Sequence, residues 1–316
     1  MNSKIREIIF GDGDIKEYAT ITTSDGIRER VHLKIGTTTL DISQRQWLLC
    51  LEPIVFGVWI ENKENKTSFD ERGDYKMCFT APAAHGNVKS GGSVVANLKL
   101  DFFDKIVEQD GLLLLLKLKE SRIHHINFMA AHLLFVKYYK KPGLSFTKLK
   151  FFASAYSYPR RVRIIGFKQG DYYNIFPMDL LGDIAAGNKF VFGLRHTNIA
   201  LAKIIESKKL VVCEVSCAYK DIIYRLGSHH SSAAPAVEQL PFKVINTRNF
   251  GFYVPEWVDS YKEIDIIKTV NLGSHMLLWG EVKDKCELKS PGQNLYHIHY
   301  LLYLYYKRKH LAYSLV

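Results

Sequence analysis

Residues 158–198 read YPRRVRIIGFKQGDYYNIFPMDLLGDIAAGNKFVFGLRHTN. An apolar strand follows Tyr158-Pro159, a turn at Gly170 leads to a second strand that runs into NIFPMDLLG, and a third strand ends at 195–198. Short apolar runs separated by glycine and proline are typical of paired strands. Such a pattern brings backbone amides, an arginine, a histidine and a hydroxyl to one end of a sheet.

The length of 316 residues suggests two domains rather than one. A content of 47% hydrophobic and 24% charged residues is ordinary for a globular protein. The N-terminus lacks the apolar core of a signal peptide, which predicts a cytoplasmic location. The longest apolar stretches, 112–116 and 295–306, are shorter than the roughly 20 residues of a membrane-spanning helix. We read both as buried strands and expect no membrane span.

The pattern of turns and apolar runs predicts a mainly β protein with a few helices. Residues 1–142 form a mainly β accessory domain, with a linker helix near 122–139 that ends before Pro142-Gly143. A tight turn is expected at Asp110-Gly111. Residues 143–316 contain one clear helix at 198–207 and six or more short strands, which favours a closed antiparallel barrel. The predicted strands include 162–167, 189–194, 210–215, 253–254, 270–271 and 276–282. An alternative for the first part is a degenerate second barrel, because 53–60 resemble 159–167 and 111–119 resemble 275–283.

The net charge of +11 is concentrated in 137–170, where nine Lys or Arg residues occur without an Asp or Glu. This run can be a solvated surface or an electrostatic funnel for a phosphorylated cofactor. A nucleic-acid partner is not expected, since the chain lacks zinc-finger spacing, RNA-recognition motifs and an obvious helix-turn-helix. A GxGxxG dinucleotide fingerprint between a strand and a helix is also missing.

No metal site is predicted. The five cysteines are scattered and form no CxxC pairs, and Cys213 and Cys217 suit one face of a strand. His124, His125 and His132 lack the helical spacing of a ligand pair.

Five segments in order resemble the flavin reductase-like family of FMN-binding split barrels, over about residues 151–310. They are the Tyr158-Pro159 strand, NIFPMDLLG, FVFGLRHTN with its following helix, SHMLLWGEV and NLYHIHYLLY. The resemblance implies an FMN-binding split β-barrel in the C-terminal half. It further implies hydride transfer from NAD(P)H to flavin N5 and on to an acceptor, and a homodimer with the flavin near its interface.

The end of the third strand is the predicted site of the FMN phosphate. A phosphate favours Arg, hydroxyl and backbone N–H donors at the start of a helix. The same residues can instead serve as a simple helix cap. The residues concerned are Arg195, His196, Thr197 and Asn198.

By resemblance, an extended loop with unpaired amides lies along the flavin ring. Its residues are Asn174, Ile175, Phe176, Pro177, Met178, Asp179 and Leu180. Asp179 departs from the Ser- and Thr-rich family pattern; it can hydrogen-bond N3–H of the ring or cap local backbone. Three histidines are further candidates near the flavin: His275 at a strand start, and His229 and His230 in a covering loop.

Three functions follow from these patterns. The first is an FMN-dependent NAD(P)H oxidoreductase, in which the cofactors carry the chemistry and no acid or base residue is required. The second is an FMN-binding electron carrier without nicotinamide activity. The third is a basic interaction protein without flavin, which uses the surface between Lys137 and Lys168.

Overall fold

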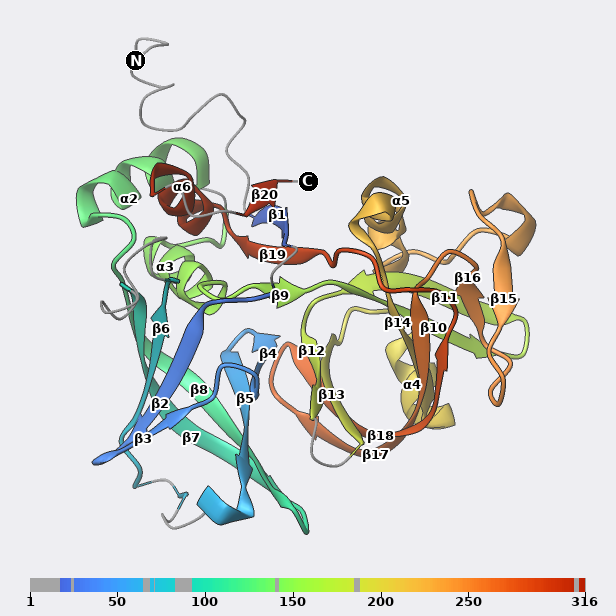
Figure 1. Cartoon of the computed structure of the whole chain (residues 1–316), viewed down its shortest axis with the longest axis horizontal. Helices are drawn as coiled ribbons and strands as arrows, with labels where there is room; N and C mark the ends of the chain where they lie inside the picture. The colour runs from blue at the N-terminus through green and yellow to red at the C-terminus, as the bar shows by residue number, and fades with distance from the viewer. Residues whose placement is uncertain are drawn as a thin grey trace.

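The computed structural model describes residues 18–23, 26–64, 69–70, 72–82, 93–139, 142–184, 188–309 and 313–315, to which all structural statements refer. The fold is mainly β, with two seven-stranded sheets lying next to one another (Figure 1). A four-stranded sheet made from distant parts of the chain crosses above them.

The first seven-stranded sheet is antiparallel and has the order β3-β2-β6-β7-β8-β5-β4. Its longest hairpin, β7–β8, turns at Asp110-Gly111 as the sequence predicts. Its strands are β2 (Arg30–Ile35), β3 (Thr38–Asp41), β4 (Gln46–Leu51), β5 (Ile54–Glu61), β6 (Tyr75–Thr80), β7 (Val94–Val107) and β8 (Gly111–Ile123).

The second seven-stranded sheet is also antiparallel and has the order β11-β10-β14-β17-β18-β13-β12. The predicted bounds of β10, β13 and β14 are within two residues of the observed ones, whereas β18 extends five residues beyond the predicted end and β17 begins ten residues before the predicted 270–271. Its strands are β10 (Arg163–Gln169), β11 (Tyr172–Met178), β12 (Leu181–Ile184), β13 (Lys189–Arg195), β14 (Lys209–Glu214), β17 (Ser260–Asn271) and β18 (His275–Glu287).

The two sheets have the same topology. When the strands of each are numbered from 1 to 7 along the chain, both orders read 2-1-5-6-7-4-3. The two fourth strands, β5 and β13, also share Val-Phe-Gly, at 55–57 and 191–193. The similarity of 111–119 to 275–283 joins the equivalent strands β8 and β18, whereas that of 53–60 to 159–167 joins the non-equivalent β5 and β10. We call residues 30–123 and 163–287 the first and second repeats.

Segments from both ends of the chain, together with the segment between the two repeats, cover the first repeat. The four-stranded sheet has the order β20-β1-β19-β9, and α2, α3 and α6 gather beside it (Figure 1). These elements are β1 (Tyr18–Thr22), α2 (Phe128–Leu134), α3 (Phe146–Ala155), β9 (Arg160–Arg161), β19 (Tyr296–His299), α6 (Tyr300–Arg308) and β20 (Ser314–Leu315). The short elements η3 (Cys217–Tyr219), α5 (Lys220–Arg225), η4 (Leu226–His230), η5 (Val237–Gln239), β15 (Val244–Asn246) and β16 (Tyr253–Pro255) adjoin the second repeat, as does α4 (Leu201–Ser207).

Two sequence predictions in these covering segments are wrong. The expected helix over 122–139 begins only at α2, because β8 continues to Ile123 and Asn127 caps the helix; a π-helical stretch, η2 (Phe135–Tyr139), follows. The expected strand over 295–306 ends at His299 and continues as α6. Tyr300, Leu302 and Tyr306 of α6 are buried in the core of the first repeat, so this helix is apolar around most of its surface.

The repeats meet through a separate apolar cluster. It consists mainly of strands 3, 4 and 7 of each repeat, namely β4, β5 and β8 against β12, β13 and β18. The sixth strands contribute Ile106 of β7 and the partly buried Val270 of β17. The Trp59 and Trp279 rings lie 6.1 Å apart at an angle of 28°. A contact that uses the same elements from both partners has the form of a symmetric dimer interface.

Glycines allow β4 to approach the second repeat closely. A Cβ atom on Gly193 would lie 1.7 Å from the Leu49 carbonyl oxygen, and one on Gly182 would lie 1.6 Å from Nε1 of Trp47. Neither distance is compatible with a side chain, so the contact depends on both glycines.

We expect Gly193→Ala to lower the free energy of unfolding by at least about 1–3 kcal/mol, because the new methyl group must displace the backbone of β4. Gly227→Ala is the matched control, since its Cβ would meet only Pro177 Cγ at 3.9 Å. Urea denaturation of both variants measures the difference. Equal stability of the two variants would show that β4 does not lie against β13 as described.

Two histidines are buried under the covering helices. Burial lowers the pKa of His125 to about 4 and that of His299 to about 3. Nδ1 of His125 donates to the Val95 carbonyl over 3.2 Å, while Nδ1 of His299 accepts from the Leu301 amide over 3.2 Å and caps α6. Both rings are therefore neutral in the folded protein at pH 7.

The free energy of unfolding should fall as the pH is lowered from about 6.5 to about 4. In this window the unfolded chain binds protons on these histidines and the folded chain does not, at up to about 1.4 kcal/mol per pH unit for each group. His299→Asn keeps a capping acceptor and removes one titrating group, so its pH dependence should be shallower. An unchanged slope in urea titrations at several pH values would contradict the neutral, buried His299.

Candidate functional site

The predicted phosphate turn follows β13. Arg195, His196 and Thr197 are exposed, and Nε2 of His196 lies 3.3 Å from Oδ1 of Asn271. Asn198 is buried, and its Oδ1 accepts from the Ala200 amide over 2.9 Å. Asn198 thus closes its own turn, whereas the N-cap of α4 is Ala200, which makes no side-chain capping bond. Among the four residues, Arg195 and Thr197 retain exposed donors that can meet a ligand.

The predicted flavin loop is in part a strand. Residues 172–178 form β11 and pair with β10, so the expectation of an extended loop with unpaired amides is wrong for these residues. Ile175 and Phe176 are buried in the core of the second repeat, and Asn174 is also buried. Pro177 is tolerated because β11 is the outermost strand of its sheet.

The short helix η4 joins two of the predicted segments. The Asn174 side-chain amide donates to the His229 carbonyl over 2.7 Å, and Nδ1 of His229 donates to the Ile175 carbonyl over 3.0 Å. The Ile199 amide donates to the His230 carbonyl over 3.2 Å. His229 therefore binds β11 through its ring and its carbonyl, and His230 binds the segment after β13 through its carbonyl. Together they connect β11 to that segment.

His275 is not on an open face. It begins β18 opposite Arg195 and is 2% exposed, with Nδ1 lying 2.7 Å from Ser274 Oγ and 3.6 Å from Cys50 Sγ. Burial, together with the charges of Arg195 and His196, lowers the pKa of His275 to about 4. His275 is therefore a neutral imidazole at the junction of the two repeats.

Residues 178–180 connect β11 to β12 and pack against the core of the first repeat. Met178 packs against the cores of both repeats, and Leu180 belongs to the core of the first. The Leu180 carbonyl accepts from the Gly193 amide over 2.8 Å, which fixes this segment beside β13. Asp179 is held between these two anchored residues.

Asp179 has a partner that the sequence did not indicate. Its Oδ2 accepts from Nδ1 of His297 over 2.8 Å, and Nε2 of His297 lies 2.6 Å from the Tyr224 hydroxyl. That hydroxyl in turn lies 2.7 Å from Thr20 Oγ1. Burial raises the pKa of Tyr224 to about 12, so the phenol stays protonated. The carboxylate is thus used by His297 rather than by local backbone.

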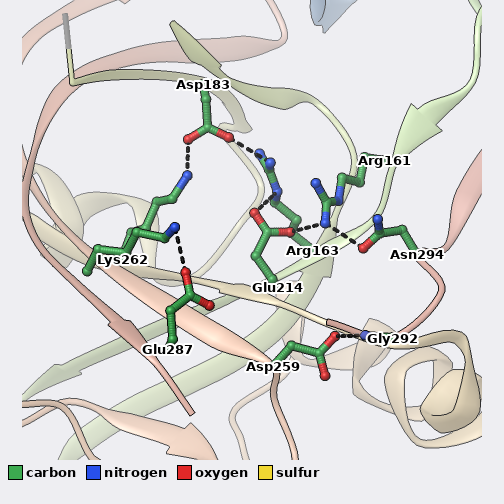
Figure 2. Close-up of polar contacts among 10 residues, drawn as sticks. Arg161, Arg163, Asp183, Glu214, Asp259, Lys262, Glu287, Gly292 and Asn294 are labelled. Carbon is green, nitrogen blue, oxygen red and sulfur yellow. Dashed lines mark hydrogen bonds and ion pairs between the residues drawn. The ribbon is translucent and has the colours of Figure 1, made fainter. Parts of the chain in front are cut away.

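Ion pairs join distant strands of the second repeat (Figure 2). Arg163 on β10 contacts Glu214 on β14 over 2.8 Å and Asp183 on β12 over 2.7 Å, and Asp183 also pairs with Lys262 on β17. Burial raises the pKa of Asp183, but Arg163 and Lys262 outweigh it and hold that pKa below its usual value. Because β10 and β12 lie near opposite edges of the sheet, this network links strands from its two ends.

The basic run of 137–170 is not one solvated surface. Arg160 and Arg163 are both buried, at 4% and 5% exposure. Arg161 pairs with Glu214 over 2.9 Å and also donates to Asn294 (Figure 2). The side chains of these three arginines thus bind other groups of the protein.

In the part of the chain that the structure describes, no group of three or more His, Cys, Asp or Glu side chains has the arrangement of a metal site. No helix there has the length and apolar character needed to cross a bilayer.

No family model and no curated protein matches the sequence. Solved structures of FMN-binding and flavin reductase proteins are similar to about half of the chain. The NADH:FAD oxidoreductase SgcE6 of Streptomyces globisporus is 10% identical, with a TM-score of 0.42, over 47% of this chain and 88% of that one. BorF, the flavin reductase component of a bacterial two-component tryptophan halogenase, is 8% identical, with a TM-score of 0.43, over 52% of this chain and 96% of that one. An FMN-binding protein of Thermus thermophilus is 17% identical, with a TM-score of 0.39, over 45% of this chain and 86% of that one.

Proposed function

We propose that this chain binds FMN and passes hydride from NAD(P)H through it to an acceptor. The observation that carries the proposal is the convergence of three segments where the repeats meet. These are the turn with Arg195 and Thr197, the anchored segment 178–180 and the start of β18 at His275. FMN supplies hydride acceptance at N5 when bound, and the protein supplies binding and orientation.

The exposed donors of the turn suit a phosphate. Among the ion pairs of the described residues none includes Arg195, and the Thr197 side chain is exposed beside it. Arginine and hydroxyl donors of this kind form charge-assisted hydrogen bonds to phosphate oxygens. A carboxylate without a partner would disfavour a reduced, electron-rich flavin, but Asp179 pairs with His297. We therefore propose that the ring lies along residues 178–180.

In the described part of the first repeat, carboxylates occupy the position equivalent to the phosphate turn. Val-Phe-Gly aligns Thr197 with Glu61, and Glu64 follows in the short helix η1 (Asn62–Glu64). Glu64 binds Arg45 at 2.5 Å, and Glu61 lies 3.9 Å from the same arginine. Carboxylates at this position repel a phosphate, so we propose one FMN site in each chain.

We further propose that the first repeat takes the place of a second subunit. The contact between the repeats uses equivalent strands from each, as in a symmetric dimer. The homodimer that the family resemblance implies would then be replaced by a monomer containing two repeats. Residues 1–142 would accordingly contribute one wall of the flavin-binding junction.

Arg195→Ala should weaken FMN binding at least about tenfold, or about 1.4 kcal/mol, through loss of a charge-assisted hydrogen bond. Thr197→Ala should weaken it less, by about threefold, through loss of a neutral hydrogen bond. Arg122→Ala and Thr39→Ala, at exposed positions in the first repeat, are the controls. Quenching of FMN fluorescence measures affinity, and NAD(P)H oxidation measures turnover.

If wild-type protein shows no affinity for FMN, the proposed function is wrong. Unchanged affinity in both turn variants would place the phosphate elsewhere and leave residues 195–198 as a cap. Tight FMN binding without NAD(P)H oxidation would identify the electron-carrier alternative.

A further inference from the structure

A cavity of about 350 Å³ lies between the two repeats and is separate from the phosphate turn. Pockets of this size suit small organic molecules. Both repeats line it, and so does the segment that leads into β10. The lining residues that matter here are Gln46, Trp47, Tyr158, Arg160, Asp179 and Tyr296.

Arg160 is a buried cation that forms no ion pair with a carboxylate among the described residues, although the charge of Asp179 acts on it from a longer distance. It is 4% exposed, and the ion pairs of the described residues do not include it, although those of Arg161 and Arg163 are present. Its Nη1 donates to Gln46 Oε1 over 2.7 Å and its Nη2 to the Ala155 carbonyl over 3.1 Å. Nε has no hydrogen-bond partner. Burying such a charge unpaired is costly, which indicates a missing anion.

Gln46 adds a second donor to the same place. It is 3% exposed, and its Oε1 is occupied by Arg160. Its Nε2 therefore carries two N–H groups, and no partner is present for them. Two neighbouring buried groups thus offer only donors. This arrangement fits an oxygen acceptor with negative charge rather than a cation.

The other charges in the cavity wall are already matched. Asp179 pairs with His297 over 2.8 Å, and Asp183 pairs with Arg163 over 2.7 Å. Phe56 and Tyr158 place their rings 5.7 Å and 5.5 Å from the Arg160 guanidinium carbon. The guanidinium is thus held in position by aromatic rings and by two acceptors, with its remaining donors unused.

We propose that this cavity binds a small anionic molecule through a carboxylate or phosphate oxygen. Arg160 and Gln46 donate to that oxygen, and the apolar part of the molecule lies against Trp47 and Tyr296. The site does not require flavin. Asp179 belongs both to the cavity lining and to the proposed flavin segment, so this ligand and the flavin would be neighbours when both are bound.

Inorganic phosphate and benzoate are the probes for the two sources of the anion. Calorimetric titration of the wild-type chain should detect one of them, benzoate for a carboxylate ligand or phosphate for a phosphorylated one. Arg160→Met removes the charge at similar length and should weaken binding at least about tenfold. Arg122→Met, at an exposed arginine, should leave the affinity unchanged.

Gln46→Glu keeps the test valid if the Arg160 variant does not fold. It places a carboxylate 2.7 Å from Nη1, so the arginine gains an internal partner and the protein should remain folded with an equal or higher melting temperature. Binding of the probe should nevertheless be lost. Failure of both probes to bind wild-type protein would overturn the proposal. Equal binding of the probe to wild type and to Gln46→Glu would also overturn the proposal, because the probe would then be an adventitious ion only.

Discussion

The close contact of β4 with β12 and β13 is the constraint on which the rest of the molecule depends. Trp47 and Leu49 of β4 reach the second repeat only because Gly182 and Gly193 have no side chains. This contact brings Cys50 to His275, and it brings the cavity wall of the first repeat to that of the second. A single strand thus positions both the proposed flavin junction and the proposed anion site.

The two repeats have the same strand order but different chemistry at equivalent places. The turn after β13 exposes Arg195 and Thr197, whereas the end of β5 carries Glu61 and Glu64, which Arg45 holds. In the first repeat the large side chains Trp47 and Trp59 instead fill the contact with its neighbour. These differences are consistent with one repeat that binds the ligand and one that supports it.

Local patterns in the sequence predicted several strands of the second repeat and one hairpin of the first. Alternation and turn residues were enough for β10, β13, β14 and the β7–β8 hairpin, because those signals are local. The sequence does suggest a second copy of the barrel, but only one of the two similarities that support it joins equivalent strands. The similarity of 53–60 to 159–167 joins β5 to β10, which occupy different places in their sheets. Strand order depends on long-range pairing, which short similarities do not specify.

The candidate site was harder to predict because its partners are far apart in the chain. His297 lies 118 residues from Asp179, and Gln46 lies 114 residues from Arg160. The sequence does show His297 within NLYHIHYLLY, but it gives no indication that this segment packs on the first repeat. The helix α6 was missed for the same reason, since its apolar residues suit a buried strand equally well.

Sedimentation equilibrium of FMN-saturated protein, recorded at both protein and flavin wavelengths, tests the central claim most directly. We predict a single species of 36.3 kDa that carries one flavin per chain. Two flavins per chain, a species of twice that mass, or flavin that does not sediment with the protein would contradict a one-chain pair of repeats with one functional site.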